Sequence, residues 1–185
     1  MATADLLQTP SIVSIVGSTI RVSHPETNGY TNTRLSAQIA AAGTAMTVYD
    51  NNNFADNDWF IAGHVGDERT ESNDVNGAVT RGTAITVTNA LSFAHPIDSP
   101  VTKIFERGIK IYGAATDGGS GTLIASVDAK TASGRQLADA AMIQWNKPYT
   151  EYTMISTDTA YAYYYVTFTD GTTDSSASDY IVAAG

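Results

Sequence analysis

The chain has 185 residues, of which 43% are hydrophobic and 16% charged, a composition typical of globular rather than disordered proteins. It carries 10 Lys and Arg against 19 Asp and Glu, a formal net charge of −9, and such a surface repels nucleic-acid phosphates. The absence of cysteine excludes disulfides, thiolate catalysis and cysteine-bound zinc. The first apolar run follows no basic segment and is broken by Pro10, so we expect neither a signal peptide nor a membrane span, and synthesis in a cytoplasm.

Residues 1–34 form an N-terminal extension with two extended segments. Apolar side chains dominate 12–16, between Pro10 and Gly17, and apolar and polar side chains alternate over 19–22. Two interpretations are open. The segments are either the first strands of the module that follows, or an arm that orders only on a neighbouring subunit, since terminal segments are often disordered until tied down.

Residues 35–104 have the pattern of a small antiparallel β-barrel or sandwich module. Short apolar runs are separated by Asp, Asn and Gly clusters about every ten residues, a spacing typical of antiparallel strands. In 36–42, Ser36 and Gly43 fit the two ends of a short helix. The alternation of Leu35, Ala37 and Ile39 favours a strand instead, and the segment is too short to form a helix without tertiary support.

Residues 105–185 contain a second set of predicted strands, separated in several places by glycine-rich turns. In the longest, residues 160–169, we expect Tyr164, Val166 and Phe168 to face the core, with alternate tyrosines on the outer face. Residues 129–149 look like an insertion that forms a surface helix or long loop. The other predicted strands are Gly108–Tyr112, Gly121–Val127, Tyr152–Ser156 and Ala177–Val182.

Two parts of the chain also resemble known protein families. Residues 35–104 resemble a β module of tailed-bacteriophage structural proteins, although Ala62 before Gly63 departs from its pattern and predicts a one-residue bulge. Residues 105–181 resemble the fibronectin type III-like (Ig-like) sandwiches appended to phage structural proteins, through Ile109, Ile111, Leu123, Ile124, Val127, Tyr164, Val166 and Phe168. The first match covers a little over a third of the chain and is carried by Phe54, Asp58, Trp59, Phe60, Ile61, Glu68, Thr70, Glu71, Phe93, Ala94, His95, Pro96, Val101, Lys103 and Ile104.

No catalytic, cofactor or metal site is predicted. The histidines at 24, 64 and 95 have no second ligand at metal-site spacing. The acidic cluster of Asp67, Glu68, Glu71 and Asp74 invites a catalytic or calcium-binding interpretation, but the neighbouring Arg69 favours charge pairing within a hairpin. The run 50–58 is rich in oxygen ligands yet lacks the alternation and the glycine of an EF-hand loop.

Aromatic side chains carry the remaining signal. Such amphipathic residues suit protein interfaces or stacking on sugars. Two alternatives stay open: the tyrosines pair across strands on one sheet, and the tryptophan caps the sandwich core. The candidate interface residues are Trp145, Tyr149, Tyr152, Tyr161, Tyr163 and Tyr165.

The resemblances imply a non-enzymatic virion structural protein, a capsid decoration or head-to-tail junction component synthesised in the host cytoplasm. It would contact major capsid or neck and tail proteins, form a homo-oligomer, and bind neither nucleic acid nor membrane. One alternative is a tail or baseplate component. Another is a carbohydrate-binding module for attachment to the host.

Overall fold

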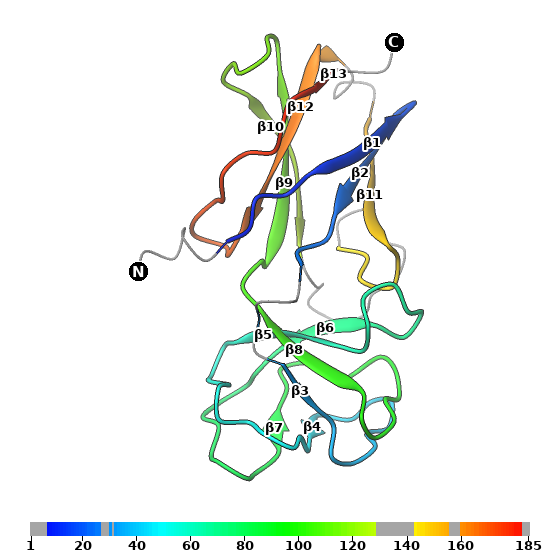
Figure 1. The fold of residues 1–185 in the computed structure, drawn as a ribbon, viewed down its shortest axis with the longest axis vertical. Helices are drawn as coiled ribbons and strands as arrows, with labels where there is room; N and C mark the ends of the chain where they lie inside the picture. Colours follow the sequence, from blue (N-terminus) through cyan, green and yellow to red (C-terminus); the bar gives the residue numbers. More distant parts are fainter. Residues whose placement is uncertain (1–6, 27–29, 31, 129–142, 156–159, 183–185) are drawn as a thin grey trace.

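The computed structural model describes residues 7–26, 30, 32–128, 143–155 and 160–182. Within these residues 13 strands form antiparallel sheets, so the chain is all-β as predicted, and none of the sheets described closes into a barrel. A β-sandwich lies above a smaller module (Figure 1). Most of the predicted insertion at 129–149 lies outside the described residues, which resume at Ile143.

The upper part is a sandwich of a three-stranded and a four-stranded sheet. This two-sheet arrangement is the one predicted for an Ig-like domain. The first sheet has the order β1 (Ile12–Val16), β2 (Thr19–Ser23), β11 (Tyr149–Thr153). The second has the order β10 (Thr122–Asp128), β9 (Gly108–Ala114), β12 (Tyr163–Thr169), β13 (Ile181–Val182).

The sandwich is discontinuous in sequence, because its first two strands come from residues 1–34. β2 pairs with β11, with Ile20 opposite Tyr152 and Val22 opposite Thr150. The apolar side chains of β2 are buried at 0–1% exposure. The N-terminal strands β1 and β2 therefore belong to the sandwich formed with residues 105–185. They are neither the first strands of the module that follows nor a free arm.

The sandwich core lies between the two sheets. In β12 the alternation is as predicted, since Tyr164, Val166 and Phe168 face the core and are at most 1% exposed. Their neighbours come from both sheets and from the segment before β11. The buried cluster comprises Ile12, Ile20, Val22, Ile61, Ile104, Ile109, Ile111, Val127, Ile143, Trp145, Met154, Tyr164, Val166 and Phe168.

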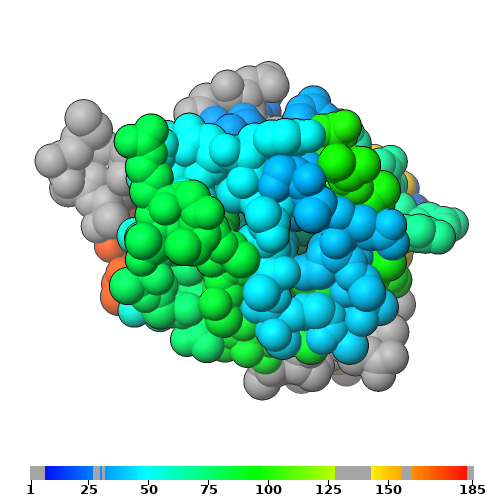
Figure 2. Space-filling view, turned by 90° about the horizontal axis from the view of Figure 1, so that it is seen from below, coloured from blue at the N-terminus to red at the C-terminus, as the bar shows by residue number. Residues whose placement is uncertain are grey.

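The lower module is inserted between β2 and β9. One sheet has the order β3 (Asn32–Arg34), β8 (Pro100–Ile104), β5 (Trp59–Ala62), β6 (Glu71–Asp74), and a small ladder pairs β4 (Ala45–Met46) with β7 (Ile85–Thr86). At the lower end, segments far apart in sequence lie side by side, blue to cyan beside green (Figure 2). Its own core comprises Leu35, Ile39, Met46, Phe54, Phe60, Ala62, Val75, Ile85, Val87, Leu91 and Val101.

Two local predictions for the module need correction. The segment 36–42 forms neither a helix nor a regular strand; it is held by isolated bridges, Leu35 to Val48 and Ile39 to His95. The expected bulge at Ala62 is absent from the ladder of β5, whose pairing with β6 and β8 is regular through that residue. The strand ends at Ala62, and Gly63 follows it with a φ of +96°, a left-handed conformation that glycine adopts without strain.

The two parts are joined by buried contacts. Ile61 and Ile104 of the module belong to the sandwich core. The fully buried Glu106 accepts hydrogen bonds from the Gln8 backbone N–H (3.1 Å) and the Tyr30 hydroxyl (2.5 Å). Tyr30 and Glu106 lie on the two connections between the sandwich and the module, and Gln8 lies just before β1, so Glu106 ties these three segments together. No helix in the described ranges is long and apolar enough to span a membrane.

Candidate functional site

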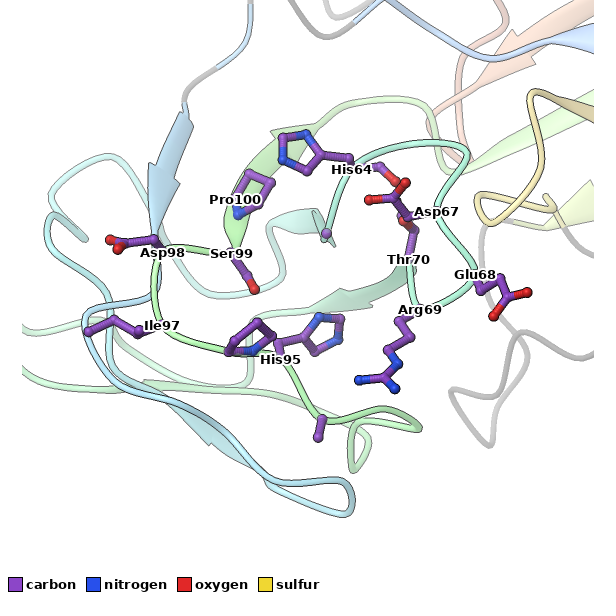
Figure 3. A pocket seen from close by; sticks show the side chains of 13 residues that line it. His64, Asp67, Glu68, Arg69, Thr70, His95, Ile97, Asp98, Ser99 and Pro100 are labelled. Carbon is purple, nitrogen blue, oxygen red and sulfur yellow. The ribbon is translucent and has the colours of Figure 1, made fainter.

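A pocket of about 550 Å³ lies in the module between the loop after β5 and the segment before β8 (Figure 3). His95 belongs to the segment before β8, with its ring on the side of the loop after β5, whereas Glu68 and Asp98 point away from the pocket (Figure 3). The lining residues are Gly63, His64, Asp67, Glu68, Arg69, Thr70, Ala94, His95, Pro96, Ile97, Asp98, Ser99 and Pro100.

Glu71 is the polar anchor behind this pocket. Its side chain is fully buried on β6 and accepts three hydrogen bonds from the chain 21 to 24 residues later. The donors are the Ser92 N–H (2.7 Å), the Phe93 N–H (3.0 Å) and the His95 Nε2 (3.0 Å). The carboxyl group therefore clamps segment 92–95 onto the sheet.

The other polar residues singled out from the sequence also brace loops. In the run 50–58, Asn51 hydrogen-bonds the backbone of Thr80, Gly82 and Thr83, and Asp58 accepts from Ala55 N–H and Lys103 Nζ. Glu71 pairs with His95 rather than with the Arg69 expected from the sequence. No group of three metal-ligating side chains occurs in the ranges that the structure describes.

The six candidate interface residues do not form one surface. Trp145 is fully buried beside His24, with ring centroids 5.1 Å apart, so it belongs to the core. Burial lowers the pKa of that histidine to about 4. Tyr152 and Tyr161 pack partly against the same core. Tyr149 lies on the three-stranded sheet, where the guanidinium carbon of Arg21 is 5.0 Å from the centroid of its ring.

Tyr163 and Tyr165 do share a face, the outer face of the four-stranded sheet, with residues that were not predicted from the sequence. Tyr165 is directly opposite Tyr112 on β9, which in turn is opposite Leu123 on β10. Directly opposite residues in an antiparallel pair point to the same side of the sheet. We call this surface the aromatic face and define it as Tyr112, Leu123, Tyr163, Tyr165, Tyr180 and Val182.

The alternation of β9 is a signal that can find Tyr112, since Ile109 and Ile111 face inward and Tyr112 must face outward. Its contact with Tyr165 depends on the pairing of β9 with β12, more than fifty residues apart, for which the sequence holds no local signal.

The rings of the aromatic face stack on one another. The centroids of Tyr112 and Tyr165 are 4.8 Å apart with an interplanar angle of 7°, and Tyr180 lies 4.7 Å from Tyr165 on a 38° tilt. Because the 4.8 Å matches the spacing of neighbouring strands, the Tyr112 and Tyr165 rings stand upright on the sheet, facing each other. The surface therefore presents ring edges and hydroxyl groups rather than open ring faces.

Charge on this side of the sheet is internally paired. Lys110 Nζ lies 2.7 Å from Asp174 Oδ1, and the Tyr112 hydroxyl donates to the other oxygen of that carboxyl (3.2 Å). The hydrogen bond to Asp174 raises the pKa of Lys110. Desolvation acts to raise the pKa of Asp174, but the hydrogen bonds from Lys110 and Thr169 outweigh it, so that this pKa is lowered.

The site geometry thus offers a clamped loop pocket in the module and an aromatic face with few charged groups on the sandwich. The pKa of Tyr112 is raised, first by desolvation and then by the charge of Asp174, and desolvation likewise raises the pKa of Tyr180. Both hydroxyls accordingly stay protonated at neutral pH, and each donates its proton within the chain, Tyr112 to Asp174 and Tyr180 to the Gly119 carbonyl (2.9 Å). In comparisons with known proteins, no family model, no curated protein and no solved structure matches the chain at a significant level.

Proposed function

We propose that the chain is a non-enzymatic structural component of a larger assembly and acts through protein–protein contacts. The observation that carries this proposal is the aromatic face. Leu123 and Val182 at its margins are 50% and 63% exposed, and stacked tyrosines lie between them. Exposed apolar and tyrosine-rich surfaces of this kind are typical of interaction sites.

The opposite outer face of the sandwich provides the contrast. There Arg21 lies 3.0 Å from Glu151, which also pairs with Lys147 at 3.2 Å, and the side chains are 28–40% exposed. This is an ordinary solvated sheet surface. The aromatic face also has a charge pair, Lys110 with Asp174, but tyrosines, Leu123 and Val182 form the rest of the surface as we define it, and this composition distinguishes it from the opposite face.

The rigid joint between the two parts also supports a structural role. The shared core at Ile61 and Ile104 and the hydrogen bonds to Glu106 hold the module on the sandwich. In addition, Arg107 donates to the Asn57 carbonyl (2.9 Å) and lies over the Trp59 ring. A building block with a fixed shape loses little conformational freedom on assembly, and this favours tight packing.

Within this class, we propose a virion protein of a tailed phage, on the basis of the two resemblances. We favour a capsid decoration or head-to-tail junction protein, contacting the major capsid or neck proteins, because the chain is small and acidic. A tail or baseplate component is the second choice.

The carbohydrate-binding alternative fits the aromatic face less well. Sugars stack on the open face of an aromatic ring. In this surface the neighbours Tyr112 and Tyr180 occupy the two sides of Tyr165. The stacked rings therefore favour a protein partner, which can use ring edges and hydroxyl groups.

Immunogold electron microscopy of intact particles with an antibody to the chain, together with mass spectrometry of the same particles, tests the proposal. Label spread evenly over the head would support a decoration protein, and label at one vertex would support a junction protein. Label on the tail would favour the second choice. Particles with neither label nor peptides of the chain would refute a role in the virion.

A further inference from the structure

The partner of the aromatic face can be inferred from its charge. Across the strands the face is formed by Leu123, Tyr112 and Tyr165, none of which is charged at neutral pH. Among the described residues, Lys110 and Asp174 form a charge pair that is neutral as a unit, and Asp117 adds one carboxylate near Tyr180. The whole chain, in contrast, has a net charge of −9. Two copies would repel each other in most orientations, and least when these weakly charged faces meet.

The size of the face also suits a second copy. Four strands at ~4.8 Å spacing span about 19 Å, and three rows of side chains along them span about 20 Å, a flat area of about 400 Å² per copy. Accessible surface exceeds flat area because side chains are corrugated. The buried surface is thus within a factor of about two of the ~800 Å² per partner found in specific interfaces.

We propose that a second copy of this chain packs on the aromatic face, with the two four-stranded sheets face to face about a twofold axis. A twofold axis lets one surface serve both partners, which is the commonest arrangement of homo-oligomers. The inference rests on the proposed role as an assembly component, but its test needs only the purified chain.

Sedimentation velocity of the purified chain across a concentration series is the first test. We expect a species of twice the chain mass, and replacement of Leu123 by Lys should weaken it by at least about tenfold in dissociation constant, or ~1.4 kcal/mol. A charge added at this position would lose its hydration when the two faces meet. The matched control is Val16→Lys, an equally exposed valine (58%) on the outer face of β1 in the other sheet, which should leave association unchanged.

A second measurement uses the unaltered chain and so does not depend on the folding of a variant. Hydroxyl-radical footprinting of dilute and concentrated samples should show a loss of reactivity at Tyr112 and Tyr165 on association. Tyr149, on the outer face of the three-stranded sheet, is the internal control and should react equally in both samples.

Three results would overturn the inference. The first is a wild-type chain that stays monomeric at about 100 µM, a concentration above the micromolar range of weak specific interfaces. The others are a dimer whose dissociation constant is unaffected by Leu123→Lys, and protection of Tyr149 instead of Tyr165 on association. Monomeric chain found in virions would reject this inference and leave the proposed function standing. A chain that forms a dimer through this face but is never found in particles would support this inference and reject the proposed role in the virion.

Discussion

The buried carboxyl group of Glu71 allows a quantitative test of how segment 92–95 is held. We consider its replacement by Ala, which removes all three hydrogen bonds, and by Gln, which keeps the shape. In Glu71→Gln one oxygen can still accept from the Phe93 N–H and His95, as Oε1 does now. The new amide group, however, places N–H donors against the Ser92 N–H, which now bonds Oε2.

The expected cost follows from the number of donors left without an acceptor. Each buried group that loses its partner costs about 1–3 kcal/mol, so Glu71→Ala should lose about 3–6 kcal/mol, allowing for some water that reaches the site from the adjoining pocket. Glu71→Gln strands one donor and should lose about 1–3 kcal/mol. Since proteins are stable by about 5–15 kcal/mol in total, the Ala variant should be close to unfolding.

Urea unfolding of both variants, with Glu68→Gln as the matched control, checks this reasoning. Glu68 is exposed on the loop just before β6, so its replacement by Gln should change the free energy of unfolding by less than about 0.5 kcal/mol. Hydrogen exchange should accelerate at the amides of Ser92 and Phe93 in the Gln variant. If Glu71→Gln has the stability of the wild type while only Glu71→Ala loses stability, the side chain merely fills space and the clamp does not exist.

Two further perturbations test other parts of the fold. Because burial lowers the pKa of His24 to about 4, the unfolded chain binds a proton near pH 6.5 that the folded chain does not. Stability should therefore fall by up to about 3 kcal/mol as the pH drops from about 6.5 to 4. Pairwise comparison of melting curves should show that His24→Gln reduces this loss and that the same change at exposed His64 does not. In Gly113→Ala, the new Cβ would lie 2.2 Å from the Tyr161 ring, so we expect a loss of about 1–3 kcal/mol, and an unchanged urea midpoint would contradict this packing.

Several strand positions were predictable from the sequence because they depend on local pattern, although the strand predicted at 152–156 lies at 149–153 and the one predicted at 177–182 is confined to 181–182. The alternation of Tyr164, Val166 and Phe168 identified the inner face of β12, since a period of two is imposed by the strand itself. Turn residues such as the positive-φ Gly118 and Gly171 marked several strand ends for the same reason. The all-β class follows from these signals alone.

The candidate interaction surface was only partly predictable, because it depends on which strands are neighbours. Tyr163 and Tyr165 were identified as an outer pair, and for Trp145 both an interface and a core position were open, of which the structure confirms the core position. Hydrophobicity alone does not tell an aromatic residue of the core from one of an interface. The contact between Glu71 and His95, 24 residues apart, likewise has no periodic signal.

The insertion of the module into the sandwich explains why the module could be recognised in the sequence and why the pairing of the N-terminal strands could not. The module's first and last strands pair with each other, with Asn32 opposite Thr102, so its two ends are adjacent. A unit whose ends lie together can be inserted into one connection of another domain without distorting it. Residues 35–104 consequently keep a self-contained pattern that is visible in the sequence. The pairing of β2 with β11 spans more than 120 residues and is set only by the burial of Ile20 and Val22, which local sequence cannot express.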